Sequence, residues 1–438
     1  MSARPNLLFL LADQWRRQAL SCHGNPLVRT PHLDRLASEG VDFRRCYATN
    51  PVCSPARATL QTGRYSHQTG FVTNNLYVGE EICLAQCFRD AGYATGYIGK
   101  WHLDGSARPG FVPPARRLGY DYFAGFNRGH VYHEPVYFSD DGELREPGIF
   151  EPTCQTDLAM DYMKGHTETD PFFLMVSYGP PHMPYVPPEG FDRVRPEDLV
   201  WRANVPDSSR ADEEVVADLC GYYGLCEAVD AEIGRLLDYL DTSGLAENTI
   251  VVFTSDHGDM HGSHGMRYKG KPQEESLGIP LIVRDPGGAR GRETDVLAGI
   301  VDMPSTFLSL CGVPVPQTMM GRDLSPALAG QDVATDCVYC EGHLNIRETA
   351  EPAERDTVSG LPCLDWRCVV TSRHKLAVDC TGQVLSLIDL VQDPYELRNL
   401  ADDPSALPLR EELLELLREK GEETGDPFPA AVPPARGD

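Results

Sequence analysis

The chain contains a series of short apolar segments, each of which runs directly into polar residues. These strand candidates cover residues 6–11, 93–98, 171–178, 249–253 and 280–283. Continuous apolar runs of this length, bounded by turn residues, are typical of strands buried on both faces of a sheet. Helical patterns separate them at residues 30–40, 80–92, 154–164 and 212–240. The alternation predicts an α/β fold with a large, mostly parallel central sheet flanked by helices.

The pattern changes near residue 334. Three short strand candidates, at residues 367–371, 375–379 and 385–390, precede an amphipathic helix over 407–420. We therefore predict two units. Residues 1–333 form the main α/β domain, and residues 334–438 form a smaller subdomain with an antiparallel sheet and a terminal helix.

Four of the strand candidates end in residue types that are able to do chemistry. The residues that follow these strands are Asp13, Gln14, Lys100, His102, His182, Asp256 and His257. In parallel sheets, ligand sites form beyond the carboxyl ends of the strands. We therefore expect these side chains to meet at one edge of the sheet.

The segment Cys53-Ser54-Pro55-Ala56-Arg57 predicts a reactive helix N-terminus. Pro55 suits the first helical position and Ser54 the N-cap, so Cys53 would lie where free N–H groups and the macrodipole favour negative charge. Arg57 opposes that dipole in the first turn, and such a local violation is most easily understood as functional. The segment therefore indicates a nucleophile and an anion site together.

This pentapeptide, with residues 59–64 after it, resembles the signature of type I sulfatases, members of the alkaline phosphatase superfamily. The resemblance implies that a formylglycine-generating maturation enzyme oxidises Cys53, and that the aldehyde hydrate then attacks sulfur. It implies that Arg57 and Lys100 lie around the formylglycine and the sulfate, and that His182 and Lys269 contact the sulfate and the leaving-group oxygen. It also implies that His102 takes the proton that releases the product.

The same resemblance implies a divalent metal site. Asp13, Gln14 and Asp256 offer oxygen ligands and His257 offers nitrogen, a set that suits calcium and also admits manganese. The family places modified Cys53 among these ligands. Many relatives carry aspartate where Gln14 stands and asparagine where His257 stands. We expect calcium, with manganese as the alternative.

The remaining polar residues concern the substrate. Asn74 matches an asparagine that can donate to sulfate in relatives, while Arg128 and His133 either contact the rest of the substrate or are solvated. A small sulfated saccharide is the expected substrate. The alternative is a phosphonate monoester or phosphodiester hydrolase of the same superfamily. Asp13-Gln14 and Asp256-His257 also resemble the metal residues of those hydrolases. The Lys100-x-His102 pattern favours the sulfatase.

Composition limits the partners and the location. The net charge of −26 argues against nucleic acid and anionic membrane surfaces, and it favours a small anionic substrate in a local basic pocket. The apolar run after Arg4 is too short for a signal peptide, and no segment has the length of a transmembrane helix. We therefore predict a cytoplasmic protein. The sequence makes no prediction about its oligomeric state.

Overall fold

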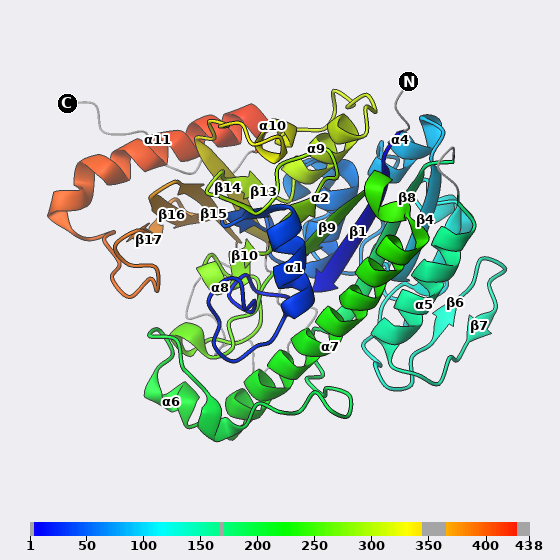
Figure 1. Cartoon of the computed structure of the whole chain (residues 1–438). Coiled ribbons are helices and arrows are strands. Elements are labelled where there is room, and N and C mark those ends of the chain that lie inside the picture. Colours follow the sequence, from blue (N-terminus) through cyan, green and yellow to red (C-terminus); the bar gives the residue numbers. More distant parts are fainter. Residues whose placement is uncertain (1–3, 167–169, 344–364, 427–438) are drawn as a thin grey trace.

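The computed structural model describes residues 4–166, 170–343 and 365–426, and its centre is a ten-stranded mixed sheet (Figure 1). The strand order is β12-β2-β11-β9-β1-β8-β4-β5-β6-β7. The bounds are β1 (Asn6–Asp13), β2 (Val41–Phe43), β4 (Ala94–Lys100), β5 (Tyr122–Phe126), β6 (Tyr137–Phe138), β7 (Leu144–Arg145), β8 (Phe172–Pro181), β9 (Thr249–Ser255), β11 (Leu281–Arg284) and β12 (Arg292–Thr294). The five central strands, β9-β1-β8-β4-β5, are parallel, which confirms the predicted fold class.

Strand β1 shows why the central strands read as continuous apolar runs. Every residue of β1 is buried, and the strand lies between β8 and β9. Leu7 and Phe9 belong to one hydrophobic core, whereas Leu8 and Leu10 belong to the core on the opposite face. Because successive side chains alternate between faces, a strand with a core on each side needs apolar residues at every position.

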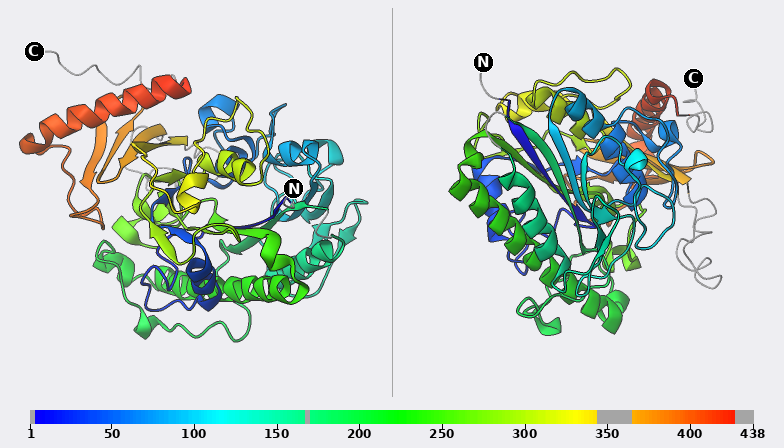
Figure 2. Two further views of the ribbon diagram at one scale, coloured as in Figure 1. Left: turned by 45° about the horizontal axis from the view of Figure 1, so that its top comes forward. Right: turned by 90° about the vertical axis from the view of Figure 1, so that its right-hand side faces the viewer.

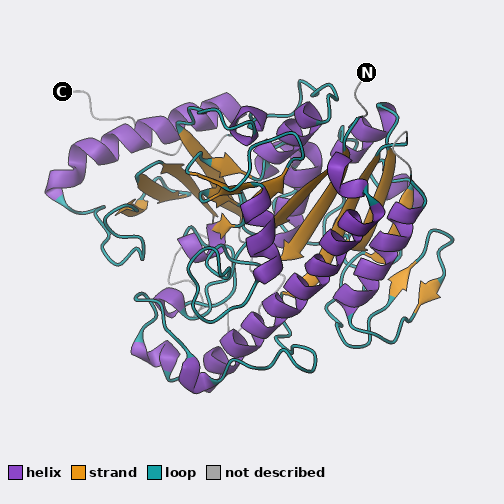
Figure 3. Ribbon diagram, viewed as in Figure 1, coloured by secondary structure: helices purple, strands orange, loops and turns teal. Residues whose placement is uncertain are grey.

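Helices cover both faces of the sheet (Figures 2 and 3). The bounds are α1 (Pro31–Glu39), α2 (Cys53–Thr62), α3 (Ser66–Thr69), α4 (Leu84–Asp90), α5 (Glu151–Lys164), α6 (Asp207–Arg210), α7 (Glu213–Ser243), α8 (Glu274–Leu277), α9 (Asp302–Leu310), α10 (Ser325–Leu328) and α11 (Leu407–Thr424). The prediction of a helix from residue 80 was too long at its start, because Cys83 is extended and α4 begins one residue later. Within the described part of the chain, no helix has the length and hydropathy needed to cross a bilayer.

A second, antiparallel sheet contains β14 (Cys337–His343), β15 (Asp365–Thr371), β16 (His374–Asp379) and β17 (Val384–Asp389), in that order. Helix α11 packs along it (Figure 2). The sequence predicted three of these strands but not β14. It also did not predict a three-stranded sheet of two-residue strands, β10 (Gly278–Ile279), β3 (Cys46–Tyr47) and β13 (Ala298–Gly299). Strands this short carry too few residues to show a period.

A buried network of charges joins the small sheet to the main sheet's loops. Lys375 of β16 donates to Glu274 of α8 at 3.1 Å and also pairs with Glu396. Glu274 in turn accepts from Arg17 at 2.6 Å. Because these groups are buried, each charge depends on its partner, and the network fixes how the two sheets meet.

Candidate active site

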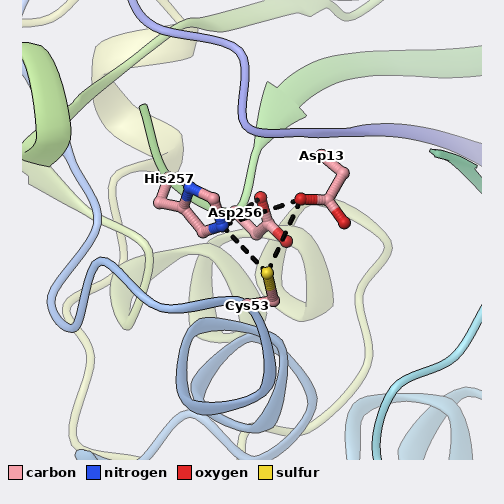
Figure 4. A group of neighbouring side chains, drawn as sticks. All are labelled: Asp13, Cys53, Asp256 and His257. Carbon is pink, nitrogen blue, oxygen red and sulfur yellow. Dashed lines mark hydrogen bonds and ion pairs between the residues drawn. The ribbon is translucent and has the colours of Figure 1, made fainter. Parts of the chain in front are cut away.

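The carboxyl ends of four adjacent strands bring the predicted residues together. Asp13 ends β1, Lys100 ends β4, His182 follows β8 and Asp256 follows β9. Cys53, the first residue of α2, points into this group (Figure 4). Its Sγ lies 3.1 Å from Nε2 of His257 and 3.7 Å from Oδ1 of Asp13. Sequence-distant groups therefore meet at one edge of the sheet, as the strand-end argument predicted.

Helix α2 begins differently from the sequence prediction. Cys53 is its first residue and Val52 is the N-cap, so the assignment of Ser54 as N-cap was wrong. The backbone N–H of Ser54 donates to Oδ1 of Asn74 at 3.0 Å, and the Ser54 hydroxyl donates to the carbonyl of His102 at 2.7 Å. Asn74 therefore supplies the acceptor that an N-cap side chain would otherwise give. Among the described residues, this leaves the Nδ2 group of Asn74 available as a hydrogen-bond donor.

Arg57 is buried and orients the carboxylates of Asp13 and Asp256. Its Nε donates to Asp256 at 2.9 Å, and its Nη2 lies 3.3 Å from Asp13. Its Nη1 donates to the hydroxyl of Ser177 at 2.8 Å and to the carbonyl of Lys100 at 2.9 Å. These contacts explain why a cation is tolerated near the N-terminus of α2, since two buried carboxylates offset the unfavourable helix dipole.

The donor atoms of Asp13, Cys53, Asp256 and His257 all lie within 4.8 Å of one another, and all four residues are buried. Nδ1 of His257 faces the carbonyl of Gly258 at 2.9 Å, so Nδ1 carries the proton and Nε2 faces the cluster. Two carboxylates and a correctly oriented imidazole fit a divalent cation. The residues present therefore suit the predicted metal site.

Gln14 presents its carbonyl oxygen to the same cluster. It has a positive φ of 71°, and its side-chain Oε1 accepts from Nζ of Lys269 at 2.6 Å. Its Nε2 donates away from the cluster, to the carboxylate of Asp259 and to Oη of Tyr185 at 2.9 Å. Sequence reasoning missed Asp259 and Tyr185. The only available signal was the position of Asp259, three residues after Asp256.

Lys269 and Lys100 surround Cys53 with positive charge. Nζ of Lys269 lies 3.1 Å from Sγ of Cys53, and Lys100 forms an ion pair with Asp13. Burial alone would raise the pKa of the Cys53 thiol, but Lys269 and Lys100 lower it well below its ordinary value. A negative group at this position is therefore strongly stabilised.

Two histidines complete the site. His102 is buried with a positive φ of 59°, and within the described residues neither of its ring nitrogens has a hydrogen-bond partner. Burial, together with the charge of Lys100, lowers its pKa to about 3, so the ring is neutral. Nδ1 of His182 lies 2.8 Å from the carbonyl of Met183, and its ring stacks on His130 at 3.8 Å. Nε2 of His182 is left to act on a ligand.

The two remaining predicted residues lie on the segment that carries His130. Arg128 is half-buried and donates to Oδ1 of Asn75, next to the asparagine that caps α2. His133 is exposed, and its Nε2 lies 3.0 Å from the carbonyl of Val186. Among the described residues, His133 has no hydrogen bond or ion pair with the cluster. The structure therefore places Arg128 beside the site and His133 further out.

Comparisons with known proteins find mainly sulfatases. Residues 5–313 match a family model described as Sulfatase, and residues 262–423 match one described as N-sulphoglucosamine sulphohydrolase, C-terminal. The chain is 36% identical to the ulvan-active sulfatase of Formosa agariphila, over 97% of this chain and 82% of the relative. A structure solved with its substrate, D-glucosamine-2-N,6-O-disulfate, is 25% identical with a TM-score of 0.85, over 97% and 99% of the chains. The phosphonate monoester hydrolase of Agrobacterium radiobacter is 25% identical with a TM-score of 0.77, over 96% of each chain.

Proposed function

The chain belongs to the sulfatase family and is a sulfuric ester hydrolase, and we propose that it acts on a small sulfated saccharide. The observation that carries the proposal is the convergence of Cys53, two carboxylates and two lysines at one edge of the sheet. Sulfated sugars are supported by the relatives, one named for ulvan and one bound to a disulfated glucosamine.

We propose that a maturation enzyme converts Cys53 to formylglycine and that Asp13, Gln14, Asp256 and His257 hold calcium, with manganese as the alternative. The modified residue would supply an aldehyde hydrate as nucleophile, and the cation would favour its ionised form. The buried, oxygen-rich donor set supports calcium, and His257 is the donor that also admits manganese.

The chain's own residues would bind and neutralise the sulfate. Charge grows on the sulfate oxygens and on the leaving oxygen as the S–O bond breaks, and preorganised cations stabilise it. Lys100 is buried and Lys269 is half-buried beside Cys53, so little of their desolvation remains to be done during the reaction. Arg57 is already paired with both carboxylates, so we assign it to holding Asp13 and Asp256 in place.

The histidines would move the protons. His182 can protonate the departing alcohol through Nε2, because its Nδ1 is held by the Met183 carbonyl. A bound sulfate raises the proton affinity of this imidazole. His102 is neutral and its nitrogens are free among the described residues, so it can accept a proton when sulfate is released. Asn74 would donate to a sulfate oxygen through Nδ2, and Arg128 and His133 would contact the rest of the substrate.

The second candidate is a phosphonate monoester hydrolase, favoured by the similarity to the Agrobacterium enzyme. Lys100 and His102 favour the sulfatase, since they supply a cation and a base beside Cys53. Hydrolysis of 4-nitrophenyl sulfate and of a 4-nitrophenyl phosphonate by one preparation decides between them. We expect the sulfate ester to have the higher kcat/KM, and a higher value for the phosphonate would exclude our proposal.

Modification of Cys53 is tested separately, by mass spectrometry of the peptide that carries this residue. Oxidation of the thiol to the aldehyde lowers the peptide mass by about 18 Da. We expect this loss when the maturation enzyme is co-expressed, and we expect Cys53→Ser to be inactive where the serine stays unmodified, because its single hydroxyl is not an aldehyde hydrate. An unmodified peptide in an active preparation would contradict the proposed nucleophile.

We also propose that the chain divides near residue 333 into a main α/β domain and a smaller C-terminal subdomain, as predicted from the sequence. A cytoplasmic location is the second proposal carried over from the sequence. Twelve described cysteines are free thiols, which supports a reducing compartment, whereas Cys380 takes part in a disulfide bond. Cell fractionation with activity measured in each fraction tests the location.

A further inference from the structure

Two arginines lie close together at the rim of the site without a carboxylate partner. Arg108 is exposed and Arg128 is half-buried. Among the described residues, neither guanidinium lies within 4.0 Å of a carboxylate oxygen. The chain has 65 acidic and 39 basic residues, so a carboxylate partner would have been easy to provide. Two unpaired like charges at one place instead indicate a ligand.

The backbone holds the two arginines on adjoining segments. The backbone N–H of Arg128 donates to the carbonyl of Pro109 at 3.0 Å, and that of Asn127 donates to Gly110 at 2.9 Å. The buried side chain of Asn127 donates further, to the carbonyl of Asp104 at 3.0 Å and of Ala107 at 3.2 Å. These bonds join residues 104–110 to residues 127–128, so the positions of Arg108 and Arg128 are set before any ligand binds.

The same segments border the catalytic cluster. Arg128 donates to Asn75, whose neighbour Asn74 accepts from the first turn of α2. Two residues beyond Arg128, His130 stacks on His182 and its Nε2 lies 3.3 Å from Nζ of Lys100. The pKa of Arg128 agrees with this position. Burial and the charge of Arg108 lower it, while the charge of Cys53 acts in the opposite direction.

We propose that Arg108 and Arg128 bind a second anionic group of the substrate, a carboxylate or a second sulfate on the same small saccharide. Guanidinium groups match both anions in geometry and give charge-assisted, often bidentate hydrogen bonds. In the proposed function, the sulfate to be cleaved binds beside Lys100 and Lys269. Arg108 and Arg128 at the rim would therefore bind a different anionic group of the substrate. This inference rests on the proposed function and names the substrate as a dianionic sulfated saccharide.

The test compares three substrates with the modified, calcium-loaded enzyme. They are a neutral monosulfated monosaccharide, the same sugar with a second sulfate, and a monosulfated disaccharide that contains a uronic acid. We expect the parent enzyme to prefer at least one dianionic substrate over the neutral monosulfated sugar. Comparison of the two dianionic substrates shows whether the second anionic group is a carboxylate or a sulfate. We expect Arg108→Gln and Arg128→Gln each to lower that preference, as a ratio of kcat/KM values, by about ten- to a hundredfold.

The loss should fall mainly on KM, because the second anionic group binds equally in the ground state and the transition state. Arg108→Lys should restore part of the preference, since lysine keeps the charge but not the fork. Arg290→Gln is the matched control. Arg290 is exposed and follows β11, which runs antiparallel to β9, so it lies at the opposite edge of the sheet. This variant should keep the parent ratio.

Equal ratios in the parent enzyme and the Arg108→Gln variant would overturn the inference, provided that the melting temperatures agree. So would a parent enzyme that prefers the neutral monosulfated sugar. Both results leave the proposed function intact, because sulfate is still released. If none of the three substrates nor 4-nitrophenyl sulfate is cleaved by protein with modified Cys53, the proposed function itself fails.

Discussion

Asp259 offers a sharp test of how the proposed metal site is built. Its carboxylate accepts from Nε2 of Gln14 and, at 2.7 Å, from Oη of Tyr185. Because a carboxylate only accepts hydrogen bonds, it fixes the amide of Gln14 with Nε2 outward and Oε1 toward the cluster. In Asp259→Asn the new amide can present its own NH₂ group, so the orientation of Gln14 is no longer determined.

The magnitude follows from the hydrogen bond that is lost. A hydrogen bond to a charged group contributes about 1.5–3 kcal/mol, which corresponds to a factor of about 10–150 in an equilibrium constant. Partners that orient metal ligands typically change metal affinity by about 10- to 100-fold. We therefore expect the dissociation constant for calcium to rise by about 10- to 100-fold in Asp259→Asn, while the protein stays folded.

Isothermal titration calorimetry of the metal-free protein with calcium measures this without any substrate. Asp218→Asn is the matched control, because Asp218 lines the same hollow as Asp259 but pairs with Arg267 at 2.6 Å. The control should bind calcium as the parent protein does. A parent-like affinity in Asp259→Asn would refute the orienting role, and an equal loss in both variants would assign the effect to charge alone.

Three further substitutions test buried charges and close packing in the fold. Burial raises the pKa of the Glu151 carboxyl from 4.5 to about 8, so its contribution to stability is present when it is protonated and is lost as pH rises from about 4.5 through 8. Glu151→Gln should remove this dependence, and melting temperatures between pH 5 and 8 should fall less than in the parent protein. Lys375→Met leaves Glu274 buried without this partner, so the free energy of unfolding in urea should drop by about 3–5 kcal/mol, and a drop below 1 kcal/mol would contradict the network. Gly221→Ala in α7 should destabilise the protein although alanine favours helix, because its Cβ would lie 1.9 Å from the carbonyl oxygen of Tyr185. Since Tyr185 contacts Gln14, calorimetry should also show weaker calcium binding. A gain in stability would contradict the close packing.

The sequence predicted the central sheet because its signal is local. Strand β1 has a core on each face, so its apolar run from Leu7 to Ala12 is unbroken, and the polar residue that follows it, Asp13, marks the sheet edge. The same reasoning located Asp256 and His257 after β9. Parallel strands end at the same edge, and the geometry of a sheet then brings residues more than 200 positions apart into contact.

The parts that the sequence missed depend on distant partners. Ser54 looked like an N-cap, but Asn74, twenty residues away, supplies the acceptor and α2 begins at Cys53. Tyr185 and Asp259 act only through Gln14, and no local pattern connects three residues on separate loops. Strands of two residues, such as β3, are defined by their hydrogen-bonded neighbours and have no period of their own.

The charges at the sheet edge indicate what the proposed modification of Cys53 would achieve beyond reactivity. Arg57 and Lys100 balance the two carboxylates, Asp13 and Asp256, which leaves Lys269 as the extra cation among these residues. An ionised thiol at Cys53 pairs with Lys269 at 3.1 Å and cancels that charge. A neutral aldehyde hydrate at the same position, before its ionisation, would leave Lys269 free to face an arriving sulfate. In a chain with a net charge of −26, an anionic substrate needs such a local excess of positive charge, so formation of the nucleophile and formation of the anion site would be one event.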